Sequence, residues 1–256
     1  MSELKELGIH WGTDKVNHGY IDVYHELFSP LKNNNNNFLE IGVWRGASIG
    51  MWSQYFSNSY IVGVDVPVEI KQNTIYPYSI EDSRKIEEQL GNVSIVHGDS
   101  ASESTITEIM DVIEKHTNRR EFDIIIDDGS HFQHDIMVGL GYMFTHLTSG
   151  GIYVIEDICS EEDLINGSQW WGHSKETHHV GGFHSDEVML AGPEVNIENC
   201  VSRVMKEFEK TGIMNSKYLT EEQNSYLTEN VCDFVRYPAM TAPIKCESEI
   251  VVLHKR

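Results

Sequence analysis

Two groups of acidic residues form the most chemically informative pattern in the chain. Segment 127–131 reads Asp-Asp-Gly-Ser-His and follows the apolar run 122–126, while Glu156 and Asp157 follow the apolar run 151–155. Short apolar runs of this kind are typical of strands buried on both faces of a sheet. Acids placed just after two parallel strands lie at one edge of the sheet, where open α/β folds bind ligands. The pattern therefore predicts a polar site at the ends of two strands.

A divalent cation is the simplest partner for these acids. With the fourth and fifth strands as neighbours, about 4.8 Å apart, Asp128, Glu156 and Asp157 lie within a few ångströms of one another. Three carboxylates so close repel, and one must take up a proton unless a cation is present. Oxygen ligands favour a hard ion, so we expect Mg²⁺, with Mn²⁺ or Ca²⁺ as alternatives. The competing explanation is that these acids cap helices or face solvent.

His131 lies in the same turn as Asp128 and has the chemistry of a general base. An imidazole accepts a proton near neutral pH. An alcohol hydroxyl is a poor nucleophile, but a metal that binds it lowers its pKa, and a nearby base completes deprotonation. We therefore predict His131 and Asp128 as catalytic residues. A structural role for His131 is the alternative, and His134 is a second candidate for the base or for orienting the substrate.

A glycine turn upstream is typical of a cofactor site. Gly42 and Gly46 separate a strand from a helix, which allows the backbone to approach a ligand. Asp65 ends the next strand, where a carboxylate can accept both ribose hydroxyls, and Asp99 ends the third, where it can meet an adenine amino group. Asp127 points the other way along its strand and serves the cofactor side or caps a helix. The predicted cofactor contacts from these strand ends and helix starts are Glu40, Gly42, Gly46, Ser48, Asp65, Asp99, Ser100 and Asp127. Solvated loops, a helix N-cap and an ordinary turn are the competing explanations.

The elements that must position these residues alternate between strand and helix. We expect strands at 38–43, 60–66, 93–97, 122–126 and 151–155, and helices at 48–56, 81–90, 106–116 and 134–147. This alternation predicts a doubly wound, mostly parallel α/β sheet with helices on both faces. A helix at 201–211 and two final strands at 231–237 and 250–254, paired as an edge hairpin, complete the sheet with seven strands.

The remaining segments suggest an N-terminal cover and an insertion. Residues 1–32 contain apolar side chains at helical spacing, at Tyr20, Val23, Tyr24, Leu27 and Phe28, and are expected to form a helical cover. Residues 33–256 are expected to form the main domain, with a substrate-side insertion at about 159–200. Four histidines in that insertion are a weak candidate for a second metal site. The five asparagines at 33–37 are expected to form a loop.

Charge and composition exclude several classes of protein. The net charge is −21, from 19 basic and 40 acidic residues, which argues against nucleic acid or an anionic membrane as partner. No run of 18 apolar residues is present, so we expect no transmembrane helix. The four cysteines are scattered, and the N-terminus is not a secretory signal, so a reduced, cytoplasmic protein is expected, with disulfides as the alternative.

Several motifs together resemble those of class I S-adenosylmethionine-dependent methyltransferases. The resemblance is narrower to the metal-dependent sugar O-methyltransferases of macrolide and rhamnosyl antibiotic pathways, and it runs from about residue 11 to 158. It rests on segments 12–15 (Gly-Thr-Asp-Lys), 18–20 (His-Gly-Tyr), 40–52, 127–131 and 150–157. The same motifs also resemble a cephalosporin hydroxylase group, which leaves the exact reaction open.

The resemblance implies a Rossmann-like methyltransferase sheet, S-adenosylmethionine as methyl donor and a sugar or glycoside as acceptor. It assigns Asp128, Glu156 and Asp157 as metal ligands and His131 as the base, and it suggests that the segment containing Thr13 lies over the cofactor. It also implies a homo-oligomer. Two other functions stay open: O-methylation of a small phenolic or catechol acceptor, and a non-catalytic subunit that binds S-adenosylmethionine.

Overall fold

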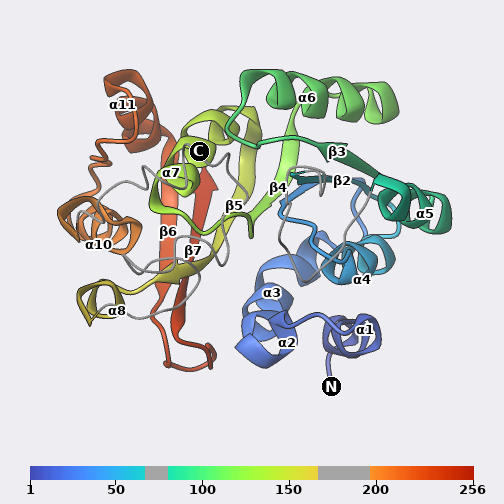
Figure 1. Cartoon of the computed structure of the whole chain (residues 1–256), viewed down its shortest axis with the longest axis horizontal. Helices are drawn as coiled ribbons and strands as arrows, with labels where there is room; N and C mark the ends of the chain where they lie inside the picture. Colours follow the sequence, from blue (N-terminus) through green and yellow to red (C-terminus); the bar gives the residue numbers. More distant parts are fainter. Residues whose placement is uncertain (67–79, 167–196) are drawn as a thin grey trace.

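A seven-stranded sheet organises the protein (Figure 1). The computed structural model describes residues 1–66, 80–166 and 197–256. The strand order is β3-β2-β1-β4-β5-β7-β6, in which β1 to β5 are parallel and β6 and β7 pair antiparallel. The strands are β1 (Asn37–Ile41), β2 (Tyr60–Asp65), β3 (Val93–His97), β4 (Phe122–Asp127), β5 (Leu147–Cys159), β6 (Val231–Tyr237) and β7 (Ser248–Lys255). The predicted sheet, the β4–β5 adjacency and the C-terminal hairpin are confirmed.

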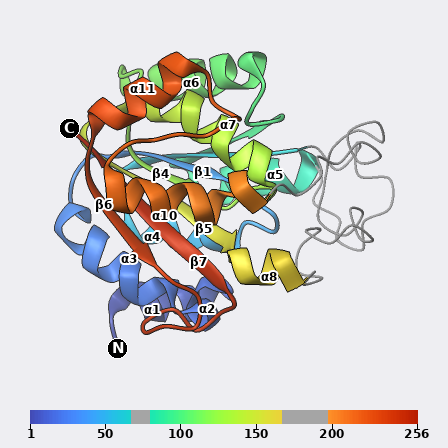
Figure 2. The same ribbon diagram turned by 90° about the vertical axis from the view of Figure 1, so that its left-hand side faces the viewer.

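Helices cover both faces of the sheet because successive strand residues point to opposite sides. In β4, Ile125 packs into the core beneath one set of helices, and Ile124 and Ile126 pack into the core on the other face. The first set is α6 (Glu103–Thr117), α7 (Gln133–Met143), α10 (Val201–Thr211) and α11 (Glu221–Asn230); the second is α1 (Glu3–Trp11), α2 (Lys15–His18), α3 (Tyr20–Phe28), α4 (Ala47–Tyr55) and α5 (Ile80–Leu90). Figure 2 shows α6 and α11 on one side of the sheet and α1 to α3 on the other.

Four short elements and helix α11 were not predicted. The short α8 (Glu161–Asn166) follows β5, and single 3-10 turns lie at Ser29–Leu31, Phe144–His146 and Ile197–Asn199. Helix α1 lies within the helical cover expected at 1–32, whereas α11 was missed because it buries only Leu227. Among the described residues, no helix is both long and apolar enough to span a membrane.

The prediction that the five asparagines at 33–37 form a loop is partly wrong. Asn37 begins β1, and both Asn36 and Asn37 are buried. The Asn37 side chain donates to the Glu121 carbonyl at 2.7 Å, and its backbone N–H donates to the Asp123 carboxylate at 2.7 Å. These partners lie more than 80 residues away in sequence, so local composition gives no sign of them.

Strand β5 is longer than predicted, and this changes how its acids are placed. Glu156 and Asp157 lie inside the strand, at a register shift between Ile155 and Ile158, rather than past its end. Asp157 adopts a positive φ of 54°. A bulge of this kind re-aims side chains next to active sites. Both consecutive acids therefore reach the same helix, since Glu156 bonds Tyr24 and Asp157 bonds Tyr20, one turn apart on α3.

Candidate active site

The glycine turn and the first acidic segment are in direct contact. The site lies where β1 and β4 are neighbours, the switch point of the strand order, at the carboxyl ends of the parallel strands. Gly42 has a φ of 92°, and a Cβ there would lie 1.9 Å from the Asp128 carbonyl oxygen. Only glycine fits at this position. The turn at 42–46 and Asp128 therefore lie side by side at the same edge of the sheet.

Lys15 lies among the acids at this edge, and the sequence pattern did not predict it there. Its side chain is 1% exposed. Its Nζ donates to Asp128 Oδ2 at 2.5 Å and to Glu156 Oε1 at 2.8 Å, and it lies 3.5 Å from Glu40 Oε1. Burial alone would lower the pKa of Lys15, but the three carboxylates raise it well above the usual value. The cation nearest Glu156 in this structure is therefore an ammonium.

Both carboxylate oxygens of Glu156 accept hydrogen bonds from side chains of the protein. Both oxygens accept from Lys15, at 2.8 and 2.9 Å, and Oε1 also accepts from the Tyr24 hydroxyl. Burial raises the pKa of Glu156 well above its usual range, and Lys15 only partly opposes this. The predicted metal ligand Glu156 thus faces Lys15, whereas the two other predicted ligands face His131.

Asp128, His131 and Asp157 come together as a second group. Their possible ligand atoms all lie within 4.8 Å of one another. His131 Nε2 is 3.9 Å from Asp128 Oδ1 and 4.0 Å from Asp157 Oδ2. The other oxygen of each acid is used elsewhere: Asp128 Oδ2 accepts from Lys15, and Asp157 Oδ1 accepts from Tyr20 and Ser248. Each acid therefore anchors itself through one oxygen and directs the other toward a shared position.

The electrostatics of this group suit a cation. Burial raises the pKa of Asp128, while Lys15 opposes the shift. Burial also disfavours the charged form of Asp157, but His131 and the hydrogen bonds from Tyr20 and Ser248 hold its pKa below the usual value. Three carboxylates, Glu40, Asp128 and Glu156, lie around Lys15, and Asp157 adds a fourth negative charge beside His131. A divalent ion beside Asp128 and Asp157 would offset the excess negative charge, so these residues fit the predicted Mg²⁺.

Two predicted cofactor contacts are engaged inside the protein. Glu40 is fully buried; its Oε2 accepts from Ser48 at 2.9 Å, and its Oε1 accepts from Trp52 Nε1 at 3.2 Å. Burial raises the pKa of Glu40 to about 7. Glu40 and Ser48 therefore connect β1 to α4 beneath the turn.

Two other predicted contacts, Asp65 and Asp99, lie at or just after the ends of the neighbouring strands β2 and β3 and accept hydrogen bonds from nearby backbone N–H groups. Asp65 Oδ2 accepts from the Val43 N–H at 3.2 Å and from the Trp44 N–H at 2.7 Å, so it holds the glycine turn from the end of β2. Asp99 is exposed and accepts from the Ala101 N–H at 2.9 Å. Its neighbour Ser100 is half-buried in the same turn.

The last two predicted contacts lie on opposite sides of the site. Thr13 is buried, and its backbone N–H donates to the Gly8 carbonyl at the end of α1. Asp127 faces α7 and accepts from the Tyr153 hydroxyl at 3.4 Å and from the Gly129 N–H at 3.3 Å. Burial raises the pKa of Asp127 to about 7.

A cavity of about 320 Å³ opens on the outer side of the same turn. Its lining comes from the end of α1, the turn and α5: Trp11, Gly12, Trp44, Arg45, Gly46, Ala47, Ile86, Gln89 and Leu90. The acids around Lys15 do not line it.

Two predicted features lie outside the described residues. Most of the expected insertion at about 159–200, including its four histidines, falls in 167–196.

Tyr20, Tyr24 and Ser248 were not predicted as site residues, although the helical spacing of the two tyrosines indicated a common buried face. A buried hydroxyl opposite an acid leaves no sequence signal of its own.

No family model matches the chain. It is 31% identical over 165 residues to demethylmacrocin O-methyltransferase of Streptomyces fradiae, covering 61% of this chain and 36% of that protein. It is 34% identical over 158 residues to L-olivosyl-oleandolide 3-O-methyltransferase of Streptomyces antibioticus, covering 59% of this chain and 33% of that protein. The chain thus spans about a third of the length of these curated relatives.

A solved structure shows the same fold. It is the MycE methyltransferase from the mycinamycin biosynthetic pathway in complex with Mg, SAH and mycinamycin VI, with a TM-score of 0.60 and 21% identity over 99% of this chain and 54% of that one. The likeness confirms the predicted Rossmann-like methyltransferase sheet. The sequence similarity confirms the resemblance to sugar O-methyltransferases of macrolide and tetracenomycin pathways.

Proposed function

We propose that this chain transfers a methyl group from S-adenosylmethionine to a hydroxyl of a sugar or glycosylated small molecule, with a divalent metal ion. One observation carries the proposal: Asp128 and Asp157 each turn one oxygen toward His131, at the edge where the glycine turn packs on Asp128. The names of the five curated relatives, all of them O-methyltransferases and three of them naming a rhamnosyl or olivosyl substrate, support the sugar acceptor.

Asp128 and Asp157 would hold the metal through the oxygens that face His131, while Lys15 keeps Glu156 and the far oxygen of Asp128 in place. When bound, S-adenosylmethionine supplies an electrophilic methyl group, and the metal ion lowers the pKa of the acceptor hydroxyl. His131 accepts the hydroxyl proton at Nε2, and the two flanking carboxylates stabilise the imidazolium that results.

The glycine turn would bind the methyl donor at the switch point of the sheet. Gly42 and Gly46 have positive φ angles that allow the tight turn, and Asp65 fixes the turn by accepting from the Val43 and Trp44 N–H groups. Asp65, at the end of β2, is the side chain that we assign to the ribose hydroxyls. Positioning of donor and acceptor is the main contribution expected of such a site.

The test is turnover of labelled S-adenosylmethionine against a panel of glycosides, nucleotide sugars and catechols. We expect labelled glycoside, loss of turnover with EDTA and its return with Mg²⁺. His131→Ala should reduce turnover about 10²–10⁴-fold. The matched control is His134→Ala, because His134 is exposed and pairs with Asp135 on α7; it should keep most of the activity.

Other results would exclude the proposal in distinct ways. Turnover that survives EDTA contradicts the metal, and labelled catechol without labelled glycoside contradicts the sugar acceptor. Binding of S-adenosylmethionine in isothermal titration with no product from any acceptor class would favour a non-catalytic subunit. Equal activity of the two histidine variants would contradict His131 as the base.

A further inference from the structure

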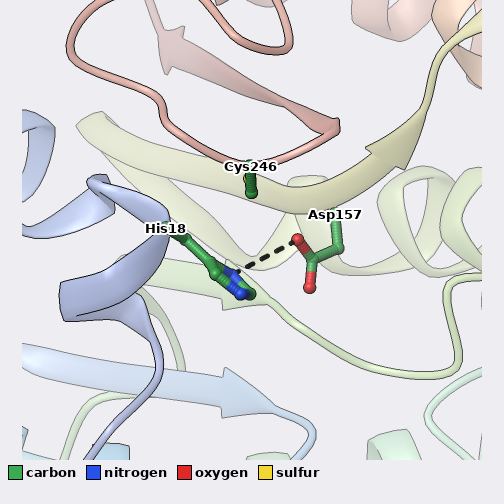
Figure 3. Close-up of side chains that lie close together, drawn as sticks. All are labelled: His18, Asp157 and Cys246. Carbon is green, nitrogen blue, oxygen red and sulfur yellow. Dashed lines mark ion pairs between the residues drawn. The ribbon is translucent and has the colours of Figure 1, made fainter.

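A second group of side chains lies on the other side of Asp157. His18 ends α2, Asp157 lies in β5, and Cys246 precedes β7; their possible ligand atoms all lie within 4.8 Å of one another. Figure 3 shows His18 and Asp157 directed toward each other with Cys246 beside them. His18 Nδ1 is 3.9 Å from Asp157 Oδ1. The reaction proposed above uses neither His18 nor Cys246.

We propose that His18, Asp157 and Cys246 form a binding site for a zinc ion. An imidazole nitrogen, a carboxylate oxygen and a thiolate sulfur are the ligand types that Zn²⁺ prefers, whereas Mg²⁺ prefers oxygen alone. Zinc–ligand bonds of about 2.0–2.3 Å place ligand atoms about 3.3–3.8 Å apart in a tetrahedron. The three groups are thus within a small side-chain movement of that geometry, and a water molecule would complete it.

Hydroxyl groups around the site hold two of the three ligand side chains in place. The Tyr20 hydroxyl lies 2.6 Å from Asp157 Oδ1 and 3.2 Å from Cys246 Sγ, and the Ser248 hydroxyl lies 2.7 and 2.9 Å from the same two atoms. Outer hydrogen bonds of this kind orient metal ligands. The His18 side chain is 23% exposed and Cys246 is half-buried, so an ion can enter from solvent. Binding releases the thiol proton of Cys246 to solvent.

Asp157 would belong to both metal sites, because Oδ1 faces His18 and Oδ2 faces His131. Zinc on the Oδ1 side withdraws negative charge from the position between Asp128 and His131. Zinc should therefore weaken binding of a hard cation there, and by linkage a hard cation should weaken zinc binding to the same extent. This consequence rests on the metal site of the proposed function; zinc binding itself does not.

The experiment is titration of the metal-free, reduced protein with Co²⁺ as a spectroscopic substitute for zinc. We expect a near-ultraviolet sulfur-to-cobalt charge-transfer band that Zn²⁺ abolishes by displacement. Histidine and carboxylate ligands elsewhere give no such band, so the readout is specific to sulfur. Cys246→Ser should lose the band. The control Cys232→Ser, which alters an exposed cysteine on β6, should keep it.

A second variant tests the nitrogen ligand. His18→Gln should keep the sulfur band but lower zinc affinity, measured by competition with a chromophoric chelator, by at least the roughly 10–100-fold that loss of an outer-shell partner costs. The proposal is overturned if the native protein shows no sulfur band, if Cys246→Ser retains it, or if His18→Gln binds zinc like the native protein. None of these readouts needs methyl transfer, so failure here is distinct from failure of the proposed function.

Discussion

The acids after β4 and within β5 differ from those at the ends of β2 and β3 in their hydrogen-bond partners. Asp65 and Asp99 accept hydrogen bonds from backbone N–H groups of their own turn or the adjacent one. Asp128 and Asp157 are instead held by side chains from distant segments and converge on His131. The same acidic sequence signal thus produces locally hydrogen-bonded turns at β2 and β3, and a charged cluster that needs cations at β4 and β5.

Lys15 should matter most, because it is the cation of the β4–β5 cluster in the absence of metal. Lys15→Met removes one partner of a buried charge network and should lower the free energy of unfolding by about 3–5 kcal/mol. The control Lys85→Met alters a lysine that is 62% exposed and pairs with Glu81 and Asp82 on α5; it should cost about 0–1 kcal/mol. Urea unfolding in EDTA measures both, and equal costs would contradict the role of Lys15.

Glu40 should make stability depend on pH. Its pKa is raised from 4.5 to about 7, chiefly by burial. A raised folded-state pKa means that this group's stabilisation is complete below about pH 4.5 and is lost as pH rises through 7. The loss amounts to about 3 kcal/mol at full ionisation, because each pKa unit between 4.5 and about 7 corresponds to about 1.4 kcal/mol.

Glu40→Gln removes that ionisation. Between pH 5 and pH 8 in EDTA, its free energy of unfolding should fall less than that of the native protein by up to about 3 kcal/mol. Glu88→Gln, on the exposed face of α5, should follow the native curve. Parallel curves for native protein and Glu40→Gln would show that Glu40 stays ionised throughout this range.

The smallest expected effects on stability are those of replacing Asp65 and Asp99, and the two replacements should differ. Asp65→Ala leaves the Val43 and Trp44 N–H groups without their acceptor and should cost about 1–2 kcal/mol. Asp99→Ala loses one bond in an exposed turn and should cost less than about 1 kcal/mol. Hydrogen exchange at the Val43 and Trp44 amides should accelerate in Asp65→Ala alone. Unchanged exchange there would mean that the turn does not need the carboxylate.

The sequence predicted most of the sheet because the signal for a buried parallel strand is local. The run 122–126 is apolar except for Asp123, and the run 151–155 contains no charged residue. The alternation of such runs with helices favours a single topology, the doubly wound sheet. The sequence did not predict the partners that decide the chemistry. Lys15 lies 113 residues before Asp128, and the bulge that turns Asp157 toward α3 arises from pairing with β7. Both depend on contacts between distant segments, which no periodic pattern encodes.

The central claim is that Asp128 and Asp157 converge on one hard cation, and Mn²⁺ binding followed by electron paramagnetic resonance tests it most directly. The signal of unbound Mn²⁺ should decrease on addition of metal-free native protein and of Asp99→Asn, and Mg²⁺ should restore it by competition. Asp128→Asn should leave the signal close to that of Mn²⁺ alone. Binding by Asp128→Asn equal to that of the native protein would contradict the claim.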